Sequence, residues 1–194
     1  MVDPKILAET EDYLVIDKPA GWVVNTAESV TGLTIQEWSG AYPVHRLDKD
    51  TSGVLLIAKN EPALAEFQRQ FKQRLTKKTY EALLHGRLEP KDGAINLPVG
   101  RSKLNRHKFC VRVDGKQAET AWQVLEYVEK NGKWFTKVRL FPKTGRTHQL
   151  RVHMAHLKHS IVGDPIYSRS DGGLRLRAKK LCFEYKGELV CYEV

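Results

Sequence analysis

The stretch TAWQVLEYVEKNGKWFTKVRLF, residues 120–141, does most to indicate the fold class. Two runs rich in β-branched and aromatic residues, 120–127 and 134–141, lie on either side of Asn131-Gly132. An Asn-Gly pair between two such runs is typical of a tight hairpin, because both residues tolerate positive φ. The stretch therefore predicts two antiparallel strands.

Other strand signals extend this pattern. A second hairpin is expected at 180–194, where Lys186-Gly187 separates two short runs. Further strands are expected at 13–16, 53–58, 79–84 and 110–113. Hairpins outnumber helices, and strands do not alternate regularly with helices. We therefore expect an α+β fold with a mixed, mostly antiparallel central sheet flanked by helices and loops.

Helices are expected at 33–38, 61–74 and 147–158. In the two longer segments apolar residues recur at helical spacing, which predicts one buried face on each: Leu64, Phe67 and Phe71, then Leu150, Met154 and Leu157. Thr147 is expected to cap the last helix.

Composition limits the classes of function. The 194 residues include 32 Lys+Arg and 23 Asp+Glu, a net charge of +9, which favours a polyanionic partner. The sequence contains no run of about 18 apolar residues, the length that would predict a membrane span. Its first residues also lack the pattern of a signal peptide. We therefore expect no membrane association and a cytoplasmic location. Cys110, Cys182 and Cys191 are expected to be reduced thiols.

Several kinds of site are excluded by the sequence. It contains no phosphate-binding G-x-x-x-x-G-K-[ST] loop, no G-x-G-x-x-G after a strand, no G-x-S-x-G elbow and no C-x-x-C pair. The histidines of one segment, His148, His153, His156 and His159, could share a metal ion. Because Arg and Lys surround them, we instead expect capping and phosphate-facing roles, and we expect no metal and no cofactor.

The segment HRLDKDTSG, residues 45–53, is the first candidate for chemistry. Its loop would display Asp48 among cationic neighbours, which favour an ionised carboxylate able to act as a nucleophile or a general base. Two other interpretations stay open. The loop could carry only a surface ion pair, or Asp48 and Asp50, about 6.6 Å apart in an extended chain, could form a hydrolase dyad. We expect Asp50 to be structural.

The segment PKTGRTHQLRVH, residues 142–153, is the second candidate. A glycine turn there would open a helix N-terminus, where Arg146 and His148 could meet a phosphate. Arg151, one turn further on, could form paired hydrogen bonds with a carboxylate. The alternative is a basic helix cap on a solvated face, and spacing alone leaves the choice open.

Together these motifs resemble the RluA-type RNA pseudouridine synthases. The resemblance rests on H-R-L-D-x-x-T-S-G at 45–53, T-G-R-T-H-Q-L-R-V-H at 144–153 and G-D-P-I-Y at 163–167. Lys18-Pro19-Ala20-Gly21 resembles that family's K-P-x-G motif, and residues 78–82 resemble its K-x-Y-x-A motif. The matches follow family order from about residue 12 to about residue 183.

The resemblance implies an isomerase that converts uridine in RNA to pseudouridine. It assigns catalysis to Asp48, to Tyr80, which would stack on the base, and to Arg151, which would pair with Asp48. Arg46 would enter the RNA where the flipped uridine leaves, and Leu150 would line the pocket. Lys18, Arg146 and His148 complete the expected RNA-binding and substrate-binding residues.

The resemblance also sets expectations about organisation and partners. We expect residues 1–194 to form one catalytic domain without a separate S4 RNA-binding domain, a monomer acting on ribosomal RNA, transfer RNA or both. The loops 97–108 and 167–173 are expected to select the RNA. Arg177 departs from the family's L-x-L-H-A pattern, which has His there. The main alternative function is a non-catalytic RNA-binding module on the same fold.

Overall fold

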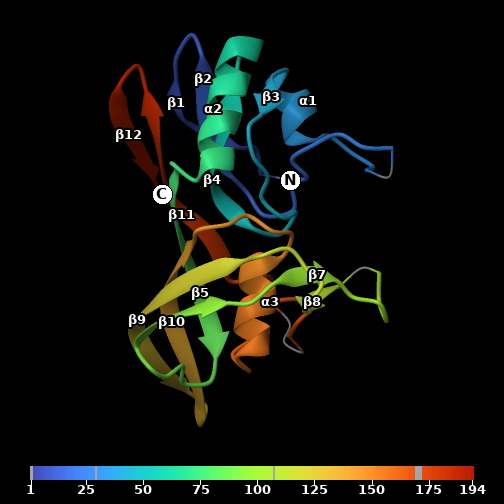
Figure 1. Ribbon diagram of the computed structural model, residues 1–194, viewed down its shortest axis with the longest axis vertical. Coiled ribbons are helices and arrows are strands. Elements are labelled where there is room, and N and C mark those ends of the chain that lie inside the picture. The colour runs from blue at the N-terminus through green and yellow to red at the C-terminus, as the bar shows by residue number, and fades with distance from the viewer. Residues whose placement is uncertain (1, 29, 107, 169–171) are drawn as a thin grey trace. The chain divides into compact units, whose positions relative to one another are not determined.

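In the computed structural model, residues 2–28, 30–106, 108–168 and 172–194 are described (Figure 1). The chain divides into two compact units. The first unit comprises 1–78 and 177–194, and the second comprises 79–176. Residues 107 and 169–171, which belong to the two loops expected to select the RNA, lie outside the described part.

The first unit is built on a mixed sheet. Strand β2 (Tyr13–Lys18) pairs antiparallel with β1 (Lys5–Glu9) and with β4 (Ser52–Ala58). The short β3 (Tyr42–Pro43) also pairs with β4. Strand β4 runs parallel to β11 (Leu176–Tyr185), which forms a hairpin with β12 (Glu188–Glu193). The helices are α1 (Ile35–Ser39) and α2 (Glu61–Gln73).

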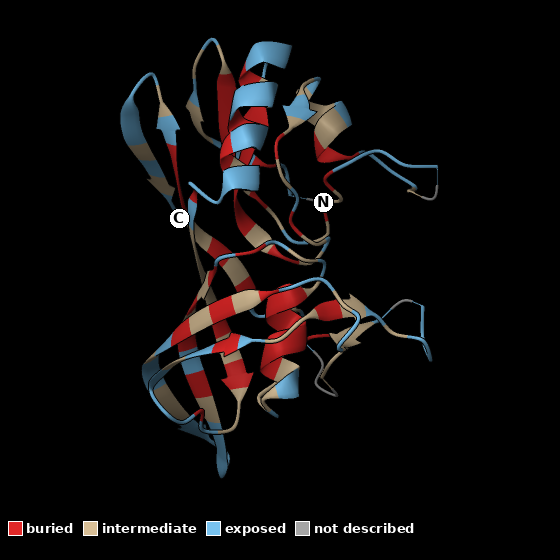
Figure 2. Ribbon diagram, in the orientation of Figure 1, coloured by how far each residue is buried: buried red, intermediate tan, exposed pale blue. Residues whose placement is uncertain are grey.

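An aromatic cluster forms the core of the first unit. The ring of Tyr13 meets Phe67 and Phe183 edge-on, with centroids 5.9 and 5.3 Å away. Phe67 comes from α2, whose other side is exposed (Figure 2). The helix at 61–74 expected from apolar spacing is therefore confirmed, because its spacing buries one face.

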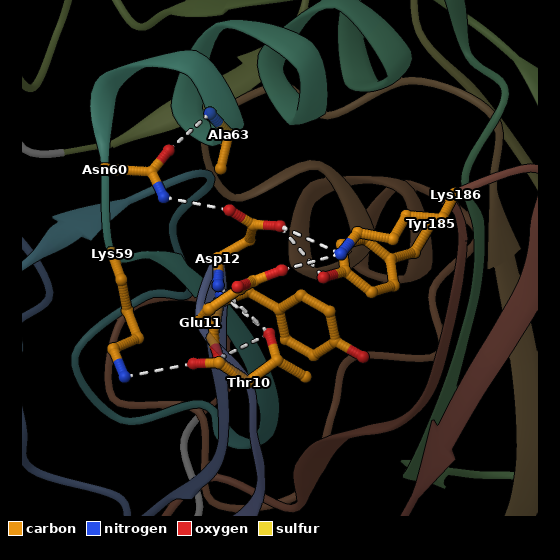
Figure 3. Close-up of polar contacts among 9 residues, drawn as sticks. Thr10, Glu11, Asp12, Lys59, Asn60, Ala63, Tyr185 and Lys186 are labelled. Atoms are coloured by element: carbon orange, nitrogen blue, oxygen red, sulfur yellow. Dashed lines mark hydrogen bonds and ion pairs between the residues drawn. The ribbon is translucent and has the colours of Figure 1, made fainter.

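A polar cluster around Asp12 ties three turns of the first unit together (Figure 3). The Asp12 carboxylate accepts hydrogen bonds from Asn60 Nδ2 at 2.9 Å and from Tyr185 Oη at 2.8 Å, and both bonds lower its pKa. Asn60 also caps α2 by accepting from the Ala63 N–H. The β1–β2 turn thus holds the start of α2 and the end of β11.

The second unit is antiparallel. Its strands follow the order β5 (Lys77–His85), β10 (Lys133–Pro142), β9 (Glu119–Lys130) and β6 (Asp92–Asn96). Strands β7 (Val99–Arg101) and β8 (Phe109–Val111) form a separate hairpin. Helix α3 (Gln149–His156) is buried along most of its length, and Leu150 and Met154 join the core (Figure 2).

Both predicted hairpins are confirmed. Asn131 and Gly132 have φ values of 52° and 69° between β9 and β10, and Lys186 and Gly187 have 51° and 83° between β11 and β12. With mixed strand pairing in the first unit and antiparallel pairing in the second, these hairpins confirm the α+β class. The sequence analysis did not identify β1, β3, β6 or β7, which are at most five residues long.

The predicted N-cap of the last helix is wrong. Helix α3 begins at Gln149, and His148 precedes it in the left-handed region with φ 56°. Its N-cap makes no side-chain hydrogen bond to the helix. Instead, the Gln149 side-chain oxygen accepts from the Arg146 N–H at 3.0 Å. A side chain of the helix, Gln149, therefore accepts a hydrogen bond from a backbone N–H that precedes the helix. In the capping expected from Thr147, a side chain before the helix would accept from a backbone N–H inside it.

The expectation of three reduced cysteines is also wrong. Cys182 and Cys191 lie directly opposite each other in the β11–β12 hairpin and form a disulfide, whereas Cys110 is a free thiol. Their pairing follows from hairpin register, which a count of cysteines does not capture. Among the residues that the structure describes, no helix is long and apolar enough to cross a membrane.

Candidate active site

Asp48 lies in the loop that joins β3 to β4. The loop is anchored by Leu47 and Thr51, which are buried, while Arg46 is exposed and Asp48 is half-buried. The Thr51 N–H donates to the Asp48 carbonyl at 3.0 Å, closing a turn around Lys49 and Asp50. This hydrogen-bonded turn holds the Asp48 backbone in one conformation.

Gly53 fixes the end of this loop against β11. Its φ is +115°, and a Cβ there would lie 2.1 Å from the Ala178 carbonyl oxygen. Only glycine permits this φ together with so close an approach. The glycine of the T-S-G part of the motif is therefore explained by packing: β11 occupies the space beside Gly53, where the loop enters β4.

Lys18 holds the backbone of the loop through a hydrogen bond to Lys49. It has 0% exposure, and its Nζ donates to the carbonyls of Trp22 at 2.9 Å and of Pro19 and Lys49 at 3.0 Å. Burial lowers the Lys18 pKa to about 8, and the carboxylates of Asp50 and Asp48 oppose that shift. Because backbone carbonyls occupy its donors, we infer that Lys18 positions the loop rather than binding RNA.

A Lys18→Met variant tests this inference. It leaves the carbonyls of Pro19, Trp22 and Lys49 without the buried cation that donates to them, so we expect the free energy of unfolding to fall by about 3 kcal/mol. Activity should fall with it, because the Asp48 loop loses its support. Urea unfolding measures the loss. The control is Lys49→Met, which removes an exposed side chain but keeps the carbonyl; equal stability of the two variants would contradict the inference.

His45, at the start of the same loop, is a neutral structural residue. Its Nε2 accepts a hydrogen bond from the Leu56 N–H at 3.2 Å, and its ring stacks on Phe71 of α2, with centroids 4.6 Å apart. Burial, aided by the nearby Lys78 cation, lowers the His45 pKa to about 3. The loop is therefore attached to α2 by a ring that stays unprotonated at neutral pH.

This pKa predicts acid sensitivity. The folded His45 excludes a proton that the unfolded chain takes up below its ordinary pKa of about 6.5. Stability from this group is therefore complete above that pH and is lost as the pH falls. Between pH 7 and pH 5 we expect a loss of about 2 kcal/mol. Unfolding curves at the two pH values should show it, and a His45→Gln variant should lose less over the same interval.

In the second unit, Arg151 is held by Asp164. Its Nε and Nη2 each donate to one Asp164 oxygen at 2.8 Å, and both side chains are almost fully buried. Burial alone would raise the Asp164 pKa, but hydrogen bonds from Arg151 and from the N–H groups of Ile166 and Tyr167 hold it below its ordinary value. The sequence analysis quoted Asp164 only as part of G-D-P-I-Y and assigned it no role.

Arg146 and His148 are both fixed by other residues. Arg146 Nε donates to the Gln117 carbonyl at 3.0 Å. His148 Nδ1 lies 2.9 Å from Tyr167 Oη, which also accepts from the Phe109 N–H. The start of α3 is thereby tied to β8 and to the segment after Asp164.

Gln149 and His153 of α3 belong to a buried polar network. Gln149 Nε2 donates to Thr120 Oγ1 at 3.0 Å, and Thr120 Oγ1 lies 2.9 Å from His153 Nδ1. His153 Nε2 donates to the Leu97 carbonyl at 2.9 Å, and burial lowers the His153 pKa. His153 is thus a structural residue. No group of three metal-ligating side chains occurs among residues 2–28, 30–106, 108–168 and 172–194.

The predicted site residues are divided between the two units. The first unit brings Lys18, Arg46 and Asp48 to one loop region. The second unit contains the other five, Tyr80, Arg146, His148, Leu150 and Arg151. Tyr80 is half-buried at the start of β5 and packs, like Leu150, against the core of its unit.

Arg177, the departure from the family pattern, has a clear structural role. Its Nη2 donates to Asp17 at 2.7 Å and its Nη1 to Ser52 at 3.4 Å. These bonds connect β11 with β2 and β4, next to the contact between Gly53 and Ala178. The arginine at this position therefore forms an ion pair with Asp17, close to the point where the Asp48 loop enters β4.

Comparison with known proteins decides the family. A family model described as RNA pseudouridylate synthase matches residues 12–156, a range that includes the Asp48 loop and all of α3. The chain belongs to this family. The resemblance inferred from the five motifs is thereby confirmed.

Individual family members support the match. A dual-specificity RNA pseudouridine synthase RluA of Vibrio vulnificus is 40% identical over 92% of this chain and 77% of its own length. A ribosomal large subunit pseudouridine synthase D of Nitrosomonas europaea is 39% identical over 86% of this chain, which spans only 50% of that relative. The solved structure of human RNA Pseudouridylate Synthase Domain Containing 1 is 32% identical, with a TM-score of 0.84 over 99% of this chain and 83% of the human one.

Proposed function

We propose that the protein is an isomerase that converts uridine in RNA to pseudouridine with Asp48 as its essential residue. The observation that carries this proposal is the Asp48 loop: it lies within the family match and is fixed by Lys18, Gly53 and His45. A rigidly held carboxylate can meet a reacting atom at a defined distance, which is what nucleophilic or general-base catalysis requires.

The reaction breaks the N1–C1′ bond of uridine and forms a C5–C1′ bond; C5 releases its proton to solvent and N1 takes one up, so the product is an isomer. A uridine inside folded RNA has to leave its stack before C1′ or C6 is accessible, at a cost of a few kcal/mol. We propose that Arg46, which is exposed beside Asp48, occupies the vacated position. Asp48 then attacks the flipped nucleotide or removes a proton from it.

The second unit would contribute the other two catalytic residues. We propose that Tyr80 stacks on the flipped base and that Arg151 stabilises the Asp48 carboxylate. The Asp164 pair supports this role, because it fixes the plane of the Arg151 guanidinium. In the same proposal Arg146, His148 and Leu150 contact RNA or line the pocket.

The finer expectations belong to the same proposal. We propose ribosomal RNA, transfer RNA or both as the substrate, in keeping with relatives named as a ribosomal large subunit enzyme and as a dual-specificity enzyme. We also propose that residues 1–194 act as one catalytic domain, as a cytoplasmic monomer without metal or cofactor.

The direct test uses cellular RNA labelled with tritium at C5 of uridine. Isomerisation releases that tritium to water, so the purified protein should release it, and pseudouridine should appear in the digested RNA. RNA that is bound without tritium release would instead indicate the RNA-binding module. Release of free uracil would indicate a hydrolase that uses Asp48 and Asp50.

A further inference from the structure

Four cations gather where α2 ends and the chain turns into β5. They are Lys72, Arg74, Lys77 and Lys78, and we call them the α2 basic cluster. Lys72, Arg74 and Lys77 are exposed and Lys78 is half-buried. The helix dipole favours a cation in the last turn, which accounts for Lys72. It does not account for Lys77 or Lys78, which lie beyond the helix.

The cluster adjoins the Asp48 loop within the first unit. Lys78 Nζ lies 5.9 Å from the centre of the Phe71 ring, and the same ring stacks on His45. His45 is followed by Arg46, the exposed cation of the loop. The cluster therefore adds positive charge beside the residue that we expect to enter the RNA.

These cations lack acidic partners. None of the four forms an ion pair with any residue in the described part of the chain. Other cations of the first unit do, among them Arg69, which pairs with Glu66 at 2.7 Å, and Lys59 and Lys186, which pair with Glu9 and Glu11 at 2.6 Å. Burial lowers the Lys78 pKa, and the nearby Arg74 cation lowers it further.

Arg74 adds an independent observation. It ends α2 in the left-handed conformation with φ 61°, where its N–H donates to the Gln70 and Phe71 carbonyls. Glycine is the preferred residue at such a position, because any side chain is strained there. The Arg74 side chain is exposed and forms no ion pair within the described residues, so its guanidinium is available to an anion outside the fold.

We propose that the α2 basic cluster binds the phosphate backbone of the substrate RNA beside the target uridine. This inference rests on the proposed function. In it, the α2 basic cluster supplies RNA affinity in addition to any contacts made by the catalytic residues. Unpaired lysine and arginine side chains bind phosphates by charge without reading sequence. The cluster therefore contributes affinity common to all substrates rather than selection of one uridine.

The test compares two triple variants with the same net charge. One carries Lys72→Gln, Arg74→Gly and Lys77→Gln. The matched control carries Lys59→Gln, Arg69→Gln and Lys186→Gln, which removes three cations that have acidic partners. Binding of fluorescein-labelled bulk transfer RNA is measured from low to high salt. Arg74→Gly alone should melt at or above the wild-type temperature, because it relieves the left-handed strain.

The cluster variant should bind roughly tenfold more weakly near physiological salt, and its plot of log affinity against log salt should be less steep by about 2. In the tritium assay its KM should rise, while its single-turnover rate at saturating RNA stays within about twofold of wild type. The control variant should match the wild type in each measurement.

Equal affinity and salt slope in the two triple variants would overturn the inference. This outcome is distinguishable from failure of the proposed function. If the wild type releases tritium but the variants bind alike, only the inference fails. If the wild type releases no tritium, the proposed function fails, and the comparison of salt slopes still decides whether the cluster binds RNA.

Discussion

An Asp48→Asn variant is expected to form pseudouridine at least about 10⁴-fold more slowly than the wild type, because the amide can neither attack carbon nor accept a proton. Asparagine has nearly the same size and keeps the backbone turn between Asp48 and Thr51. The fold should therefore survive, and RNA should still bind with similar affinity.

The matched control is Asp50→Asn in the same turn. Asp50 lies two residues away and, like Asp48, interacts with the Lys18 cation. The Asp50→Asn variant therefore removes a negative charge near the loop but keeps the proposed catalytic carboxylate. We expect Asp50→Asn to keep activity within about tenfold of wild type. Tritium release by Asp48→Asn at the wild-type rate would refute the assignment, and equal loss in both variants would favour a pair of carboxylates.

An Asp164→Ala variant is expected to show the largest loss of stability, about 3–5 kcal/mol. The substitution leaves the Arg151 guanidinium buried without its carboxylate and leaves the Ile166 and Tyr167 N–H groups without their acceptor. Activity should also fall in molecules that remain folded, because Arg151 loses the partner that fixes its orientation. Urea unfolding and single-turnover assays at low temperature separate the two effects.

A double variant separates stability from function in this pair. Arg151→Met combined with Asp164→Leu replaces two buried charges with apolar side chains of similar volume, which often restores stability. We expect the part of the stability lost to the unpaired guanidinium to return, but not the part lost at the Ile166 and Tyr167 N–H groups, while pseudouridine formation stays low. If the double variant regained wild-type activity, Arg151 would have no role in the reaction.

Much of the fold could be predicted because local signals and the structure agree. Asn131-Gly132 and Lys186-Gly187 adopt the positive φ values that their hairpins need, and the apolar spacing of 61–74 corresponds to the buried face of α2. Prediction failed where tertiary context decides. The Cys182–Cys191 disulfide depends on cross-strand register, and the start of α3 depends on a glutamine side chain reaching backward.

The site was predicted less completely. A sequence motif marks which residues belong together but not which of them touch substrate. Lys18 looked like an RNA-binding lysine, although three backbone carbonyls surround it. Asp164 was overlooked because its partner, Arg151, is thirteen residues away across a turn. Lys72, Arg74, Lys77 and Lys78 stand close together in the sequence, but only the structure shows that they form no ion pair in the described part of the chain.

The division of the chain has a consequence for protein synthesis. The second unit is one continuous segment, 79–176, whereas the first unit needs strand β11, which begins at Leu176, far along the chain from the end of β4 at Ala58. As the chain leaves the ribosome, the second unit can fold early, whereas β4 cannot pair with β11 until that strand has been synthesised. The space beside Gly53 is filled only then, so the Asp48 loop would be among the last parts of the protein to take its final form.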